Sequence, residues 1–284
     1  MAFSLQSVLE ELGELEPFPS AAVRVMELSM AGEPDPVELA LVIKMDVGMT
    51  AKVLKLANSA VHSTIVEITS IEQAAVKLGS DELARLAMTC GAAAFYSGLG
   101  SSTPRSNKSL WEESVTNAIA ARLVAQDRGR ERPDTHYTIG LLMNMGHVVL
   151  DRFLRIQRES VLAKIDCGAR ALRAERDVLG ITHAELGSRM ARRWGFPSAL
   201  VDAIANHHTP DRGEDPELCA DVNLAEALTW EAMREDESSP LAYGVSGATV
   251  GRVGVVQEDV DAIRAALPVA VEAQRYLMGM SDAA

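Results

Sequence analysis

The chain has 284 residues and is acidic, with 40 Asp and Glu against 27 Lys and Arg and a formal net charge of −13. An acidic surface repels phosphate backbones, which argues against nucleic acid as a main partner. Hydrophobic residues make up 48% of the sequence but aromatic residues only 4%. The core therefore has to be filled by aliphatic side chains and methionine, which favours packed helices and excludes a disordered chain.

The cysteines and the N-terminal segment indicate the cellular compartment in which we expect the protein. Cys90, Cys167 and Cys219 are far apart and odd in number, which predicts reduced thiols and neither a disulfide framework nor a zinc site. Residues 1–17 lack the features of a secretory signal. The most apolar run, 86–99, is shorter than the roughly 20 residues that span a bilayer. We expect a cytoplasmic protein with no membrane insertion.

Helix start signals recur along the chain. Asp35 before Pro36 places a side-chain acceptor at an N-cap and a proline at the first helical position. Ser70 and Thr182 each begin a capping-box pattern. Apolar residues recur at helical spacing after these starts, and the one strand-like run, 245–256, contains glycines that favour a loop. The sequence predicts an all-α fold.

A stretch rich in Gly, Ser and Pro at 98–108 is the clearest interior break. We therefore predict two helical lobes, an N-terminal lobe at 1–105 and a C-terminal lobe at 106–284. Softer breaks at 129–135 and 209–217 separate helices within the second lobe.

Ordered motifs run through both halves. The first half contains DVGMTAKVLKLANSA at 46–60 and ITSIEQAAVKLG at 68–79. The second half contains LWEES at 110–114, GLLMNMG at 140–146, HAELG at 183–187, WGFP at 194–197 and AIANHHTP at 203–210. In order and spacing these segments resemble the HDOD family (HD-related output domain), over about residues 15–275. The resemblance implies a two-lobed helical fold with an HD-like second lobe.

The resemblance also locates a degenerate metal site. Enzymes of the HD superfamily hold divalent ions with an adjacent His-Asp pair and hydrolyse phosphate esters. Here that pair is replaced by Met143 and Asn144, and the outer ligand positions fall at Glu113 and Glu226. A thioether is a poor ligand for Mg²⁺, Mn²⁺ or Fe²⁺, and an amide oxygen is uncharged. We expect no catalysis, no bound metal and no cofactor.

Histidines remain near this site. His183, His207 and His208 are either a residual ligand cluster that holds a borderline ion such as Zn²⁺ with Glu226 or Glu113, or hydrogen-bonded packing residues. We favour the packing interpretation. His147 stands where the family often has Lys, and we expect it partly exposed on a helix. We expect His62 and His136 in loops.

Two groups of three arginines stand out: Arg189, Arg192 and Arg193 on a predicted helix, and Arg128, Arg130 and Arg132 in one loop. We interpret both groups as solvated surfaces. The alternative for the first group is contact with phosphates or with a partner, because guanidinium groups pair well with phosphate oxygens.

The resemblance implies a non-catalytic adaptor in bacterial signal transduction. Its expected partners are sensor kinases, response regulators, and the diguanylate cyclases or phosphodiesterases of cyclic-di-GMP signalling. The alternatives are a nucleotide-binding sensor and a residual metal-dependent phosphohydrolase. A homodimer is compatible with the sequence.

Overall fold

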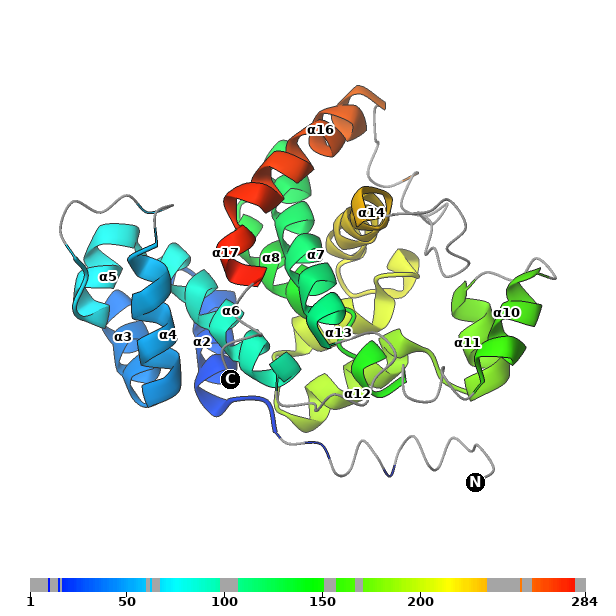
Figure 1. Ribbon diagram of the computed structural model, residues 1–284, viewed down its shortest axis with the longest axis horizontal. Helices are drawn as coiled ribbons and strands as arrows, with labels where there is room; N and C mark the ends of the chain where they lie inside the picture. Colours follow the sequence, from blue (N-terminus) through cyan, green and yellow to red (C-terminus); the bar gives the residue numbers. More distant parts are fainter. Residues whose placement is uncertain are drawn as a thin grey trace.

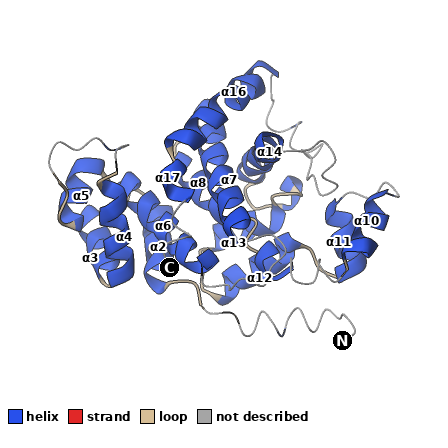
Figure 2. Cartoon of the chain, in the orientation of Figure 1, coloured by secondary structure: helices blue, strands red, loops and turns tan. Residues whose placement is uncertain are grey.

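Helices make up most of the chain that the computed structural model describes, which comprises residues 10, 15, 17–59, 62, 67–97, 107–150, 157–166, 171–233, 251 and 257–278. These residues form helices, turns and loops without a strand (Figure 2), so the predicted all-α fold is confirmed. The predicted lobe boundary, Cys167 and all but residue 251 of the glycine-rich stretch at 245–256 lie outside them. No described helix is both long and apolar enough to cross a membrane.

The elements follow one another without repeats. In chain order they are α2 (Ser20–Ala31), α3 (Pro36–Lys44), α4 (Val47–Ala57), α5 (Ile71–Leu78), α6 (Ser80–Ser97), α7 (Asn107–Asp127), α8 (Pro133–Leu142), α10 (Arg158–Asp166), α11 (Ala171–Leu179), α12 (His183–Arg193), α13 (Ser198–Asn206), the short 3-10 helix η2 (Pro210–Arg212), α14 (Pro216–Met233), α16 (Gln257–Ala273) and α17 (Arg275–Met278).

The predicted helix starts are confirmed by their hydrogen bonds. The Asp35 side chain accepts from the backbone N–H groups of Val37 and Glu38. The Ser70 hydroxyl accepts from the backbone of Gln73. Thr182 forms a complete capping box with the residue three positions on. Each cap satisfies N–H groups that the first helical turn leaves without an intrahelical partner, so the chain enters these helices at defined residues.

The helices form two groups joined by α6 (Figure 1). Helices α3, α4 and α5 lie at one end of the molecule, and α6 packs against α2, α4 and α5 on one side and against α7 and α8 on the other. Helices α7, α8 and α14 pack together as the centre of the second group, and α12 packs on α13. Helix α6 therefore carries one hydrophobic core from the first group into the second.

Aromatic side chains concentrate where the two groups meet. The Phe18 ring lies 6.1 Å from the Trp194 ring and 5.1 Å from the Phe196 ring, measured between centroids. Tyr96 of α6 lies 5.8 Å from Trp111 of α7. The Trp111 indole N–H also donates to the carbonyl of Leu277, 3.1 Å away. The few aromatic residues of this chain thus join helices that are distant in sequence, where large rings bury the most area.

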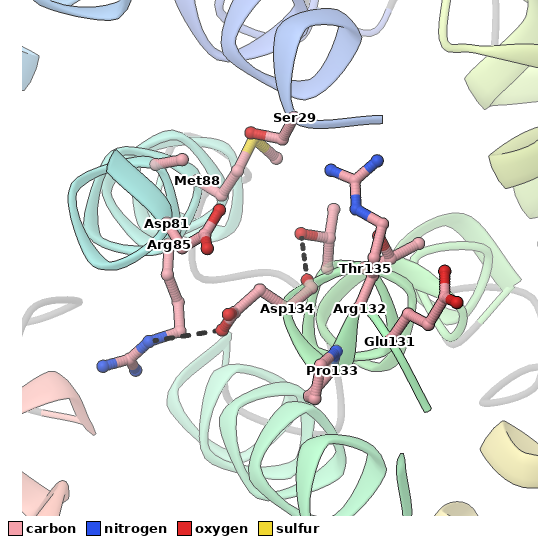
Figure 3. A pocket seen from close by; sticks show the side chains of 11 residues that line it. Ser29, Asp81, Arg85, Met88, Glu131, Arg132, Pro133, Asp134 and Thr135 are labelled. Atoms are coloured by element: carbon pink, nitrogen blue, oxygen red, sulfur yellow. Dashed lines mark hydrogen bonds and ion pairs between the residues drawn. The ribbon is translucent and has the colours of Figure 1, made fainter. Parts of the chain in front are cut away.

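A small pocket lined by charged side chains lies at another part of this junction, between α2, α6 and the start of α8 (Figure 3). Its cavity is about 60 Å³, room for no more than about two waters. The Arg85 side chain crosses from α6 to within 3.8 Å of the Asp134 carboxylate on α8, as the dashed line shows. The lining charges therefore tie α6 to α8 and leave no room for a larger ligand.

Two glycines allow helices to approach closely near the predicted site. A Cβ on Gly140 would lie 2.6 Å from the carbonyl oxygen of Asn117, so α8 crosses α7 at backbone contact. A Cβ on Gly146 would lie 2.0 Å from the carbonyl oxygen of His183. The turn after α8 is consequently pressed against the first residue of α12, and this contact brings the predicted site residues together.

Candidate functional site: a buried carboxyl, amide and histidine cluster

Most of the predicted site residues meet in one buried region. Helix α7 supplies Glu113, the turn after α8 supplies Asn144, and α14 supplies Glu226. The start of α12 and the end of α13 supply the three histidines, His183, His207 and His208. All of these residues are buried except His208, which is slightly exposed. Met143 is fully buried in the surrounding core.

Asn144 joins two carboxyl groups. Its side-chain nitrogen donates to Glu113 Oε1 at 3.3 Å and to Glu226 Oε1 at 3.0 Å. Burial raises the pKa of Glu226 to about 8, and neither the Asn144 hydrogen bond nor the nearby His183 offsets this. At neutral pH this carboxyl is therefore mostly protonated. The amide N–H groups place partial positive charge between the two carboxyls.

The residues at this position do not fit the metal pair of an HD phosphohydrolase. The side-chain nitrogen of Asn144 faces the carboxyls, and nitrogen of an amide does not ligate hard cations. The thioether of Met143 is fully buried in apolar surroundings and is a soft, weak donor. Glu113 and Glu226 meet across Asn144 itself, so the chain closes this part of the site with its own hydrogen bonds.

The three histidines contact one another directly. His183 Nε2 lies 3.3 Å from His207 Nε2 and 3.0 Å from His208 Nε2. His208 Nδ1 lies 3.5 Å from Glu226 Oε2, which links the rings to the carboxyl joined by Asn144. Burial, reinforced by the neighbouring imidazoles, lowers the pKa of His207 to about 3 and that of His208 well below its ordinary value. Both rings are therefore neutral at physiological pH.

Two acceptors orient these rings. His183 Nδ1 lies 3.0 Å from the Glu175 carboxylate, which also accepts from the His183 backbone N–H at 3.0 Å. His207 Nδ1 lies 2.8 Å from the carbonyl oxygen of Ile204. Because a carbonyl only accepts, His207 carries its proton on Nδ1 and presents the lone pair of Nε2 to the cluster. Glu175 was not among the predicted site residues, although it precedes Leu179 and Gly180 in a segment that resembles the HDOD pattern, and that match was the available signal.

His147 lies in a helical turn as expected, but the expectation that it is partly exposed is wrong. Its side chain is buried, and its ring stacks on the ring of His183 with centroids 4.2 Å apart and planes 15° apart. The cause is the close approach at Gly146, which carries the next residue under α12. His147 therefore belongs to the wall of the cluster.

His136 also departs from its predicted loop position. It lies within α8, is buried, and its Nε2 is 3.2 Å from the Asp221 carboxylate of α14. His62 falls in a single 3-10 position between α4 and α5 and lies 3.6 Å from Glu82.

The loop arginines Arg128, Arg130 and Arg132 form ion pairs and hydrogen bonds with other helices, so their interpretation as a solvated surface is wrong. Arg128 and Arg130 lie 2.9 and 2.7 Å from the fully buried Asp221 carboxylate. Arg132 donates to the backbone carbonyls of Met30 and Gly32 at the end of α2. This loop therefore fastens α14 and α2 to the start of α8.

The arginines of α12 lie on its outer face. Arg189, Arg192 and Arg193 are exposed, whereas His183, Gly187 and Met190 of the same helix are buried. At 100° per residue Arg192 lies directly opposite His183, and Arg189 and Arg193 lie on the flank between the two sides. The arginines therefore do not face the buried cluster, and any phosphate or partner that they contact lies at the surface. That role stays a prediction.

Comparison with known proteins decides the family. The HDOD domain matches residues 15–210, which is more than half of the chain.

The chain belongs to the HDOD family. The matched range includes Asn144 and all three histidines of the cluster. An uncharacterized Treponema pallidum protein is 26% identical over 216 residues, which are 71% of this chain and 39% of that protein. The HDOD chain thus spans about two fifths of this relative.

Solved structures share the fold. An HDOD domain protein of unknown function from Geobacter sulfurreducens has a TM-score of 0.68 at 24% identity, covering 94% of this chain and 97% of that one. A Marinobacter aquaeolei protein described as a signal transduction protein has a TM-score of 0.73 at 22% identity, covering 99% of this chain and 62% of that one. At these identities the likeness concerns the helical architecture of the HDOD chain.

Proposed function

We propose that this HDOD chain is a non-catalytic module of bacterial signal transduction that acts by binding other proteins. The observation that carries the proposal is the bridge that Asn144 makes between Glu113 and Glu226. In a metal-dependent phosphohydrolase a divalent ion polarises the phosphate and activates the attacking water. Here a neutral amide stands between the two carboxyls, and it supplies neither Lewis acidity nor a bound hydroxide.

A surface of the first helical group supports partner binding. Val37 and Leu41 of α3 and Met45 at its C-cap follow one another at four-residue spacing and are 69%, 59% and 84% exposed. Residues at this spacing lie on one helix face. Val47 continues the apolar surface at the start of α4, with 83% of its surface exposed. We propose that this stripe receives an amphipathic helix of a signalling protein, a common mode of recognition by helical surfaces.

The expected partners are sensor kinases, response regulators, and the enzymes that make or degrade cyclic-di-GMP. The support for this is family membership and the name given to the Marinobacter aquaeolei structure. The nucleotide-sensor alternative has less support, because Arg189, Arg192 and Arg193 face away from the buried cluster. The residual-hydrolase alternative has less support because the thioether of Met143 and the amide of Asn144 are poor ligands for a catalytic metal ion.

A hydrolysis assay tests the non-catalytic part. The purified chain is incubated with bis(p-nitrophenyl) phosphate and with cyclic-di-GMP in Mg²⁺, Mn²⁺ or Fe²⁺. We expect no turnover above that of the metal alone. The matched control is Glu226→Gln, which keeps the shape of the side chain but cannot ionise to an anionic metal ligand. Metal-stimulated turnover by the parent chain that disappears in this variant would overturn the proposal.

Affinity capture tests the binding part. The tagged chain and the double variant Leu41→Gln/Met45→Gln are used to capture proteins from native lysate under gentle conditions. Both side chains are largely exposed, so we expect the substitutions to leave the core unchanged. We expect signalling proteins of the named classes to bind the parent chain, and to bind the variant weakly. Failure to recover any such protein, or equal recovery by the variant, would contradict the proposed mode of binding.

A further inference from the structure

Three helices bring four potential metal ligands into contact beside the Asn144 bridge. His183 opens α12, His207 and His208 follow the end of α13, and Glu226 lies within α14. The ligand atoms that these four side chains offer all lie within 4.8 Å of one another. The cluster adjoins the lost His-Asp position through Glu226, which accepts from Asn144, but neither Met143 nor Asn144 contributes a ligand atom to it.

Outer acceptors hold two of the imidazoles so that their inner nitrogens face each other. His207 Nδ1 lies against the Ile204 carbonyl, and His183 Nδ1 lies against the Glu175 carboxylate. The Nε2 atoms of the two rings therefore face each other at 3.3 Å. His208 Nε2 lies 3.0 Å from the same His183 atom, so three ring nitrogens converge. Convergent imidazole nitrogens are the arrangement in which histidines ligate a divalent ion.

The spacing suits a tetrahedral ion. Zn–N bonds of about 2.0–2.1 Å place two tetrahedral ligands about 3.3–3.4 Å apart. The two nitrogen pairs that include His183 are 3.3 and 3.0 Å apart. Glu226 Oε2 lies 3.5 Å from Nδ1 of His208 and supplies a carboxyl oxygen, which becomes an anionic ligand when the ion displaces its proton. Three imidazoles with one carboxylate favour borderline ions such as Zn²⁺ over Mg²⁺ or Ca²⁺.

We propose that His183, His207, His208 and Glu226 form a closed, non-catalytic site for a borderline divalent ion such as Zn²⁺, which fastens α12, α13 and α14 together. Four protein ligands complete a tetrahedron and leave no position for a reactive water. The ion therefore acts as a structural fastener in a chain that performs no hydrolysis. This inference goes beyond the proposed function, since partner binding neither requires nor excludes the ion.

Glu175 is the positioning residue of this site. Its carboxylate fixes the ring of His183 through Nδ1 and also accepts the backbone N–H of the same residue. Carboxylates that orient a ligating histidine in this way typically affect metal affinity by about 10- to 100-fold. Glu175→Gln is therefore expected to weaken Zn²⁺ binding by that factor, while the stoichiometry at saturating Zn²⁺ stays at one ion per chain.

The test uses the purified full chain, freed of metal with a chelator and then titrated with Zn²⁺ or Co²⁺. We expect one Zn²⁺ per chain, the intense visible bands of four-coordinate Co²⁺, and a rise in the melting temperature with Zn²⁺ but not with Mg²⁺. His207→Gln and Glu226→Gln are expected to lose stoichiometric binding. His62→Gln is the matched control and keeps it, because His62 pairs with Glu82 outside the cluster.

Several outcomes overturn the proposal: no stoichiometric Zn²⁺ on the parent chain, Co²⁺ bands of six-coordinate character, or full binding by both Glu226→Gln and His207→Gln. Loss of binding in His62→Gln would also overturn it, because the ion would then lie elsewhere. Should His207→Gln fail to fold, the near-isosteric Glu226→Gln and the Co²⁺ spectrum of the parent chain decide. Phosphodiesterase activity is not a readout, so failure here leaves the proposed function separately testable.

Discussion

The second half of the chain buries two polar clusters that balance their charges differently. Around Asp221, one carboxylate is met by Arg130, Arg128 and His136. Around His183, imidazoles meet one another and a carboxyl group. The first cluster contains its own cations. In the second, three imidazoles and one carboxyl group offer potential ligand atoms that lie within 4.8 Å of one another.

This difference separates a structural ion pair from a binding site. A buried carboxylate that receives several charge-assisted hydrogen bonds is satisfied by the chain alone. A group of imidazoles held by outer acceptors, with ring nitrogens that converge, should be stabilised by adding a cation. The two clusters should therefore respond differently to mutation and to metal.

The largest effect is expected at Asp221. Asp221→Asn leaves two guanidinium groups without their buried counter-charge and should lower the free energy of unfolding by about 3 kcal/mol, measured by urea denaturation. Glu217→Gln is the control. It removes the other carboxylate partner of Arg130, but that carboxylate is 60% exposed, so the expected loss is about 0.5 kcal/mol or less. Equal losses in the two variants would contradict the account of Asp221 as the centre of the cluster.

The pH dependence of the Asp221→Asn effect tests whether the charge of Asp221 stabilises the fold. Burial alone would raise the pKa of Asp221, but hydrogen bonds from His136 and Arg130 outweigh burial and hold it below its ordinary value. A carboxyl with a lowered folded-state pKa stabilises the fold above its unfolded pKa, about 3.9, and loses that contribution as the pH falls below it. The stability difference between parent and variant should therefore shrink below about pH 4.

The second effect is stabilisation by Zn²⁺. At free Zn²⁺ 100-fold above its dissociation constant, the free energy of unfolding should rise by about 2.7 kcal/mol. The same gain is expected in Glu217→Gln, and none in His207→Gln. Urea denaturation with and without chelator measures it. A gain of equal size in His207→Gln would show that the ion stabilises the chain through some other group.

The third effect is expected at Gly146. A Cβ there would lie 2.0 Å from the His183 carbonyl, so Gly146→Ala has to push α12 away and should cost about 2 kcal/mol. Zn²⁺ affinity should fall as well, because His183 moves. Gly48→Ala is the control, since its Cβ would meet only Asp46 Oδ1 at 3.4 Å, and alanine in an exposed helix gains up to about 1 kcal/mol. An unchanged or increased stability in Gly146→Ala would refute the close approach.

The parts of the fold that could be predicted are those encoded locally. Asp35, Ser70 and Thr182 form bonds to residues two or three positions on, so sequence alone predicts where these helices begin. Met143 and Asn144 were chosen from a contiguous motif, and the structure places Asn144 between Glu113 and Glu226. In each case the residues that carry the signal lie on one helix or in one short segment.

The remainder depends on contacts between distant helices. His136 meets Asp221, 85 positions away, and Arg130 meets the same carboxylate. Neither pairing has a signal in the spacing of either segment. The histidines were expected mainly to pack the lobe, because sequence shows neither which way a ring points nor that Glu175 and Ile204 turn two of them inward.

The smallest effect is expected on the outer face of α12, and it tests how far the cluster extends. Arg192 is exposed and lies on the opposite side of the helix from His183. Arg192→Ala should therefore change the free energy of unfolding by no more than about 0.5 kcal/mol and leave Zn²⁺ affinity unaltered. Isothermal titration with Zn²⁺ and urea denaturation measure the two quantities. A marked fall in Zn²⁺ affinity would mean that the charge of this face acts through the helix, and the separation of an inner ligand face from an outer arginine face would then be wrong.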